Sequence, residues 1–250
     1  MSGIADLFAA ELPLPAYDVV IPCFNRAHVV ADAVASVLTQ DHAPTRVIVV
    51  DDGSSDHSAA VIAEVADAHD GFVVAALLPR NGGASAARNV GAALCRSPWV
   101  AFLDSDDVWL PGAARALLAG AEDADIVCGH FRRVEPNGVP GLPECGWWGD
   151  DIRVALSHGG VIGPSWSIVR RRTVAAVQGF DPSFHNCNDW DFYTRAAAAG
   201  ARFRRIEAAV ALYRTVAGSR LVNDLAIGAE NARRVLAHPL FAELRDLEDA

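Results

Sequence analysis

Residues 46–56 read Arg-Val-Ile-Val-Val-Asp-Asp-Gly-Ser-Ser-Asp, and this stretch decides the fold class. Its first part, residues 46–50, is a nearly continuous apolar run rich in β-branched side chains. Such runs are typical of a strand that is buried on both faces of a parallel sheet. The turn at residues 52–56 offers side chains that cap a following helix. A buried strand, a polar turn and a helix in this order predict an α/β fold.

The same unit repeats on both sides of this stretch. We expect strands at residues 19–21, 72–78 and 99–103, and helices at 29–40, 59–69 and 84–95, where apolar residues recur with a helical period. Strands alternating with helices predict a mostly parallel, Rossmann-like sheet flanked by helices on both faces.

The second half of the chain is less regular. We expect strands at residues 126–131, 165–169 and 208–213, and helices at 190–199 and 224–236. Residues 135–150 are rich in Pro and Gly and are interpreted as a loop. This part is expected to form a smaller mixed sheet and a C-terminal helix.

Polar residues follow each of the first four expected strands. They are Asn25-Arg26, Asp51-Asp52, the segment at residues 80–83 and the acidic run at residues 104–107. Ligands of open α/β sheets bind at the carboxyl ends of the strands. These segments are therefore predicted to meet at one site.

The triplet Asp104-Ser105-Asp106 is the strongest candidate for a metal site. Two carboxylates at i and i+2 in a bend can face one cation, and hard ions such as Mg²⁺ or Mn²⁺ prefer oxygen ligands. The alternative interpretation is a solvated acidic turn.

Composition and missing motifs exclude several classes of protein. The formal net charge of −10 argues against a nucleic-acid partner. No Gly-rich dinucleotide fingerprint, P-loop or nucleophile elbow is present. The N-terminus does not resemble a secretory signal, and no apolar run reaches the ~18 residues of a membrane span. Five cysteines without a paired pattern indicate free thiols, so we expect a cytoplasmic protein with at most peripheral membrane contact.

Taken in order, several segments resemble the inverting nucleotide-sugar glycosyltransferases of family 2, which have the GT-A fold. They are Val-Val-Ile-Pro-Cys-Phe-Asn-Arg (19–26), Val-Val-Asp-Asp-Gly-Ser-Ser-Asp (49–56), Asn-Gly-Gly-Ala-Ser-Ala-Ala-Arg-Asn (81–89), Phe-Leu-Asp-Ser-Asp-Asp-Val-Trp (102–109), Gly-Phe-Asp-Pro-Ser-Phe (179–184) and Asn-Asp-Trp-Asp-Phe (188–192). The resemblance implies one domain over residues 1–250. Its parts would be a nucleotide-sugar half (17–107), an acceptor half carrying the base (108–215) and a helical tail (216–250).

The resemblance also implies roles for individual residues. Asp189 is expected to be the catalytic base, and Asp106, with Asp104, the ligand of Mn²⁺ or Mg²⁺. Asp52 is expected to accept a hydrogen bond from a uracil or thymine base, which favours a UDP or dTDP donor. The remaining nucleotide contacts are expected from Pro22, Phe24, Asn25, Arg26, Arg88, Asp104 and Ser105.

Two positions depart from the family pattern and keep other functions open. Asn188 stands where the family usually has Glu, and Val216 stands where it often has a metal-binding His. A catalytically inactive sugar-nucleotide-binding module is therefore one alternative. A sugar nucleotidyltransferase is another, although the first turn lacks the Gly-rich, basic loop that a triphosphate needs. The acceptor is expected to be a small molecule, a glycan or a lipid-linked sugar.

Four tryptophans are candidates for contact with the acceptor or donor sugar. Trp166, Trp190, Trp147 and Trp148 have apolar ring faces that can stack on sugar rings. The alternative is that they fill the core or anchor a loop.

Overall fold

The computed structural model describes residues 13–135, 137–214, 225–242 and 244, and its described strands form one sheet. The strands are β1 (Tyr17–Cys23), β2 (Arg46–Asp51), β3 (Val73–Leu77), β4 (Trp99–Phe102), β5 (Val108–Trp109), β6 (Ile126–Val134), β7 (Pro140–Glu144), β8 (Ser167–Arg170) and β9 (Phe203–Tyr213). Their order is β3-β2-β1-β4-β8-β6-β9-β5, and β7 pairs with β6 beside this path.

The first four strands are parallel, as predicted. β1 lies between β2 and β4, and β3 pairs with the outer side of β2. The register places Val19 opposite Val47, and Val49 opposite Ala75. All carboxyl ends of these strands therefore lie at one edge of the sheet.

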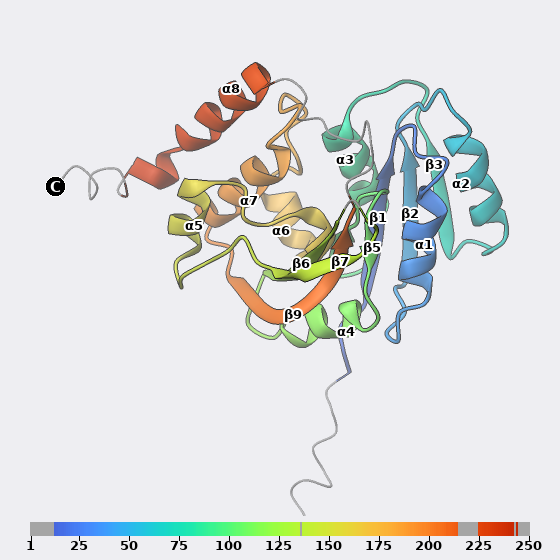
Figure 1. Cartoon of the computed structure of the whole chain (residues 1–250), viewed down its shortest axis with the longest axis horizontal. Helices are drawn as coiled ribbons and strands as arrows, with labels where there is room; N and C mark the ends of the chain where they lie inside the picture. The colour runs from blue at the N-terminus through green and yellow to red at the C-terminus, as the bar shows by residue number, and fades with distance from the viewer. Residues whose placement is uncertain (1–12, 136, 215–224, 243, 245–250) are drawn as a thin grey trace, which may run out of the picture.

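The mixed part of the sheet continues from the parallel part without a break. β8 runs antiparallel between β4 and β6, so it joins the two halves. β9 is parallel to β6, and β5 is antiparallel to β9. Figure 1 shows β9 curving beneath β6 and β7, so the mixed part is a curled extension of the same sheet.

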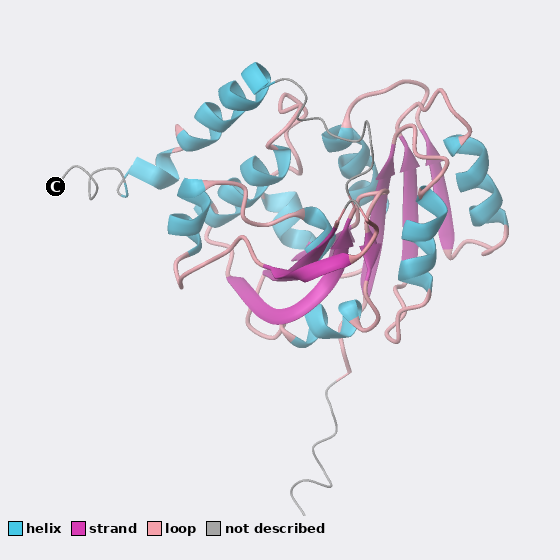
Figure 2. Ribbon diagram, in the orientation of Figure 1, coloured by secondary structure: helices cyan, strands magenta, loops and turns pink. Residues whose placement is uncertain are grey.

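Helices cover both faces of the sheet (Figure 2). Side chains alternate along β1, with Val19 and Ile21 in one apolar cluster and Val20 in the other. Helices α1 (Val30–Leu38), α2 (Ser58–Asp67) and α4 (Ala113–Ala119) contribute to the first cluster. The second cluster contains residues of α3 (Ala84–Leu94), α5 (Ile152–His158), α6 (Arg171–Ala176), α7 (Asn188–Ala198) and α8 (Leu225–Leu236).

Helix α3 packs unusually close to β1. A Cβ atom on Gly91 would lie 2.3 Å from Val20 Cγ1, so only glycine fits this contact. The contact fixes α3 on the sheet. It thereby sets the depth of Arg88, which lies one turn earlier on the helix.

The structure corrects several predictions in the second half. Residues 135–150 are not wholly a loop, because they contain strand β7, in which Pro140 and Pro143 lie opposite Val134 and Arg132 of β6. The strand expected at residues 165–169 is a 3₁₀ turn, η2 (Pro164–Trp166), followed by β8. Helices α4, α5 and α6 were not predicted, and a 3₁₀ turn, η4 (Pro239–Phe241), follows α8.

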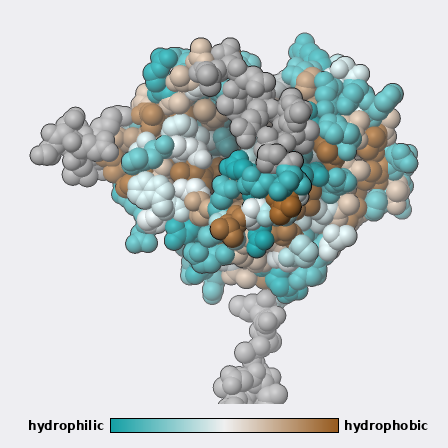
Figure 3. Space-filling model, viewed as in Figure 1, coloured by the Kyte–Doolittle hydropathy of each residue, from teal (hydrophilic) through white to brown (hydrophobic). Residues whose placement is uncertain are grey.

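No described helix has the length and apolar character needed to cross a bilayer. Figure 3 shows hydrophobic surface in the region of β7, beside hydrophilic surface. In this strand Leu142 is 84% exposed.

Candidate functional site

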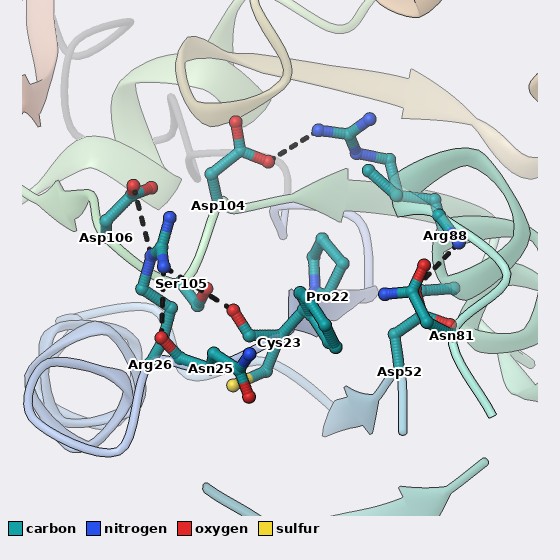
Figure 4. A pocket seen from close by; sticks show the side chains of 14 residues that line it. Pro22, Cys23, Asn25, Arg26, Asp52, Asn81, Arg88, Asp104, Ser105 and Asp106 are labelled. Carbon is teal, nitrogen blue, oxygen red and sulfur yellow. Dashed lines mark hydrogen bonds and ion pairs between the residues drawn. The ribbon is translucent and has the colours of Figure 1, made fainter. Parts of the chain in front are cut away.

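A cavity of about 430 Å³ lies at the carboxyl edge of the parallel strands (Figure 4). Its walls come from the four polar segments that the sequence predicted to meet, together with the end of β1 and the first turns of α3. They are formed by Pro22, Cys23, Phe24, Asn25, Arg26, Asp52, Asn81, Gly83, Ala84, Ala87, Arg88, Asp104, Ser105 and Asp106. Every residue expected to contact the nucleotide or the metal thus lines one cavity.

Asp52 is held rigidly at the end of β2. Its two carboxylate oxygens accept backbone hydrogen bonds from Gly82 and Gly83, each 2.8 Å long, at the N-terminus of α3. Burial nevertheless raises the pKa of Asp52, against the effect of these two bonds. Because each carboxylate oxygen has two lone pairs, Asp52 retains acceptor capacity toward the cavity.

The loop after β1 is tied to the loop after β2. Asn25 has a φ of +54°, a left-handed conformation that Asn tolerates better than most residues. Its Oδ1 accepts the backbone N–H groups of Ser55 (2.8 Å) and Asp56 (3.3 Å), and its own N–H donates to Ser54 Oγ. The side-chain carbonyl oxygen of Asn25 is therefore occupied by hydrogen bonds from the loop after β2. The expected contact of Asn25 with the nucleotide stays a prediction.

Two arginines neutralise the carboxylates of the acidic triplet. Arg88 Nη2 donates to Asp104 Oδ1 at 2.6 Å, and Arg26 Nε lies 3.6 Å from Asp106 Oδ2. Burial raises the pKa of Asp106, and the neighbouring Asp104 raises it further, while Arg26 opposes them. Both carboxylates stay partly exposed, with side chains 32% and 20% accessible.

This donor set fits a hard divalent cation. Asp104 and Asp106 present carboxylate oxygens at the cavity, which suit Mg²⁺ or Mn²⁺. Within the described ranges, no three His, Cys, Asp or Glu side chains are grouped as a metal site would require. The protein alone therefore supplies few ligands. Val216, the position expected to matter for metal binding, lies outside the described residues.

The turn that carries the acidic triplet is held by hydrogen bonds to residues for which the sequence predicted no role. Buried Asp107 accepts hydrogen bonds from Ser165 Oγ (2.5 Å) and from the Arg214 backbone N–H (3.0 Å). Ser165 Oγ also accepts the N–H of Asp104, and Arg214 Nε donates to the Asp106 carbonyl. Burial, with the charge of Asp104, raises the pKa of Asp107 well above its usual range. The continued acidic run at 104–107 was the only sequence signal for this support.

Asp189 lies beside the cavity rather than in its wall. It is in the first turn of α7, where its Oδ1 accepts the Trp190 N–H at 2.8 Å. Arg88 connects the two places, because its Nη1 donates to Asn188 Oδ1 at 3.0 Å while its Nη2 holds Asp104. Burial raises the pKa of Asp189, the positive charge of Arg88 lowers it, and Asp104 raises it.

The four tryptophans differ in environment. Trp190 is buried and donates its indole N–H to the Leu156 carbonyl, and Trp147 is buried against Phe203, so both lie in the core. Trp166 stacks on Phe131 with ring centroids 4.2 Å apart. Trp148 is 50% exposed, and of the four it keeps the most ring surface free for a sugar.

Residues 18–172 match the family model described as "Glycosyl transferase family 2". The chain belongs to this family. As a family 2 glycosyltransferase, the chain is an enzyme of the nucleotide-sugar transferase class, and its α/β sheet has the GT-A architecture that the sequence predicted. It is 32% identical over 245 residues to the succinoglycan biosynthesis protein ExoU of Rhizobium meliloti (strain 1021), covering 88% of this chain and 69% of ExoU.

Two solved structures share the fold of this glycosyltransferase. Staphylococcus aureus TarS 1-349, in complex with UDP-GlcNAc, is similar with a TM-score of 0.70 at 20% identity, over 89% of this chain and 70% of TarS 1-349. The mannosyltransferase PcManGT from Pyrobaculum calidifontis, in complex with GDP-Man and Mn²⁺, has a TM-score of 0.63 at 19% identity. That match covers 89% of this chain and 61% of PcManGT, so the chain spans less than two thirds of that relative.

Proposed function

We propose that this glycosyltransferase moves a sugar from a nucleotide diphosphate to an acceptor hydroxyl, with inversion at the anomeric carbon. The observation that carries the proposal is the double contact of Arg88. Its guanidinium holds Asp104 in the cavity wall and Asn188 beside the expected base. One side chain thereby links a nucleotide-sized cavity to the first turn of α7, where Asp189 lies.

The donor proposed for the cavity is UDP or dTDP carrying a sugar. Asp52 is fixed by two glycine N–H groups and offers acceptor lone pairs, which complement the N3–H of uracil or thymine. Phe24 is 42% exposed in the cavity wall and provides a ring face for the base. TarS was solved with UDP-GlcNAc and PcManGT with GDP-Man, so relatives support a nucleotide sugar without fixing the base.

Mn²⁺ or Mg²⁺ is the proposed cofactor, held by Asp106 with Asp104. When bound, the ion neutralises charge that develops on the departing diphosphate. In this structure Arg26 and Arg88 lie against these carboxylates. The chain alone is therefore expected to bind the ion weakly.

Asp189 is the proposed general base. Among the described residues it has no arginine within salt-bridge distance, unlike Asp104 and Asp106. A carboxylate that forms no ion pair keeps an oxygen available for the proton of the acceptor hydroxyl as the new bond forms. With one base and no carboxylate placed as a nucleophile, a single displacement inverts the anomeric configuration.

The acceptor proposed is a small molecule, a glycan or a lipid-linked sugar, with membrane contact only at the periphery. Trp148 is the side chain we assign to its sugar ring. All five cysteines are free, which supports the cytoplasm as the compartment.

The test has two steps. Thermal shifts with UDP, dTDP, GDP and CDP, each with and without Mn²⁺, identify the base and test the metal. Release of the free nucleoside diphosphate is then measured with donor, acceptor and Mn²⁺. Asp106→Ala should lose the Mn²⁺-dependent part of binding, whereas Asp123→Ala, at an 88% exposed position, should not. Binding without release would favour the inactive sugar-nucleotide-binding module, which the neutral Asn188 keeps open.

A further inference from the structure

The loop at residues 181–187 leads directly into the first turn of α7, where Asp189 lies. The segment before this loop is fixed from two sides. Asn89 of α3 exchanges two hydrogen bonds with the backbone of Phe180, at 2.7 and 2.8 Å, and Arg195 of α7 donates to the Gly179 carbonyl. These contacts do not reach the second half of the loop.

The loop from Ser183 to Asn186 is held by α8. The amide of Asn231, which is 4% exposed, donates to Asn186 Oδ1 at 2.6 Å and to the Asn186 carbonyl at 3.3 Å. Arg234 donates to Ser183 Oγ at 2.7 Å and to the Ser183 carbonyl at 3.3 Å. Its guanidinium carbon lies 3.9 Å from the centre of the Phe184 ring.

The helix packs closely on this loop at Gly228. A Cβ atom on Gly228 would lie 3.3 Å from the side-chain nitrogen Nδ2 of Asn186. Val235 of α8, with Phe241 of η4, belongs to the apolar cluster that contains Trp190 and Phe192 of α7. Figure 1 shows α8 on the same side of the sheet as α7.

The contacts between α8 and the loop matter because the loop ends in an unfavourable backbone conformation. Cys187, the residue before α7, has a φ of +57°, which costs free energy for any residue with a Cβ. Such a conformation persists only where the surroundings enforce it. Asn231 holds Asn186, the residue before Cys187, and Arg88 holds Asn188, the residue after it.

We propose that α8 is a positioning element for catalysis, in which Asn231 and Arg234 fix the direction of the Asp189 carboxylate. The inference rests on the proposed function for its catalytic consequence, since it assumes that Asp189 is the base. Neither residue lines the cavity. Both therefore act on turnover rather than on binding of the donor.

The experiment compares Asn231→Asp and Arg234→Ala with Arg233→Ala. Arg233 is a matched control because it is 71% exposed and its ion pair, within the described part of α8, is with Glu230 one turn earlier. We expect kcat to fall about 10- to 100-fold in the first two variants, the range that a displaced catalytic group produces. KM for the donor and the affinity for UDP with Mn²⁺ should stay unchanged. Arg234→Lys, which keeps a donor for Ser183, should recover part of the loss.

A second measurement tests, without using activity, whether Asn231 and Arg234 order the loop at residues 181–187. Cys187 is half-buried in the loop, whereas Cys23, Cys95 and Cys128 are buried elsewhere. Alkylation of Cys187 by iodoacetamide, followed by peptide mass spectrometry, should be severalfold faster in Asn231→Asp and Arg234→Ala, with the three buried thiols unchanged.

The outcomes separate the two claims. Unchanged Cys187 labelling, or equal acceleration at all four thiols, would show that Asn231 and Arg234 do not order the loop. In the variants the loop would then be no looser than the rest of the domain. Faster Cys187 labelling with an unchanged kcat would overturn the catalytic role of α8. If the wild-type chain binds UDP but transfers no sugar, the proposed function fails, while the labelling still decides whether α8 orders the loop.

Discussion

The replacement Asp189→Asn tests the proposed base most directly, because the structure predicts opposite effects on rate and stability. The amide is isosteric, and its oxygen can still accept the Trp190 N–H that Asp189 Oδ1 accepts at 2.8 Å. What disappears is the ability to take a proton. A positioned general base contributes roughly 10²- to 10⁴-fold, which is about 2.7 to 5.4 kcal/mol of activation free energy.

Stability should not fall with activity. Burial raises the pKa of Asp189, so the ionised carboxylate is less favourable in the folded protein than in the unfolded chain. Above that raised pKa the charge costs folding free energy, and the neutral amide removes this cost. We therefore expect an unfolding midpoint at least as high as that of the wild type, and unchanged affinity for the nucleoside diphosphate.

The assay combines single-turnover transfer, urea unfolding and calorimetric titration at one pH near neutrality. Asp191→Asn is the matched control in the same helical turn. Asp191 forms two hydrogen bonds with Arg195, at 2.7 and 2.9 Å, so its replacement should lower stability while most of the transfer rate remains. A transfer rate within tenfold of wild type in Asp189→Asn, or a clear loss of its stability, would refute the assignment.

Further predictions concern the cavity, the sheet and pH. In Asp52→Asn, one of the two backbone N–H groups faces an amide donor in place of a carboxylate oxygen. The free energy of unfolding in urea should therefore fall by about 1–3 kcal/mol, and titration should show a weaker affinity for the nucleotide. Gly91→Ala forces a Cβ against Val20 and should cost about 1–3 kcal/mol in the same unfolding assay. In the kcat–pH profile, the rate of transfer should fall as the pH decreases, because the base must be ionised. Since burial raises the pKa of Asp189, this fall should begin at a pH above the ordinary pKa range of aspartate. Asn188→Glu adds a negative charge beside Asp189 and should move this acidic limb to higher pH; an unmoved limb would contradict the assignment of the limb to Asp189.

The parallel half of the fold was predictable because its signals are local. Apolar runs such as 46–50 are followed by Asp or Pro, and the helix after each turn shows a clear period, so boundaries fell within one or two residues. The short helices α4, α5 and α6 have only six or seven residues, too few for a period to stand out. Strand β7 was missed because its two prolines favour a loop interpretation.

The candidate site was predictable where chain topology alone brings residues together. Asp52 and Asp104 follow β2 and β4, the two strands that flank β1 in the parallel part of the sheet, and their place at one edge follows from that topology. The support of Asp107 by Ser165 and Arg214 was not predictable, since those contacts span 58 and 107 positions in the chain. The burial of Trp190 was not predictable either, because it depends on which face of α7 packs against α5. Hydropathy does not distinguish a helix face in the core from a helix face that binds a ligand.

Strand β7 has a consequence for how copies of this enzyme meet one another. An outer strand with free amide hydrogens recruits a strand from a second molecule, which is a common route to aggregation. Two of the five residues of β7 are prolines and carry no amide hydrogen, so a continuous ladder cannot be extended from it. The exposed Leu142 can therefore attract a neighbour only through its side chain. The chain should thus tolerate high concentration without sheet-to-sheet polymerisation along this edge.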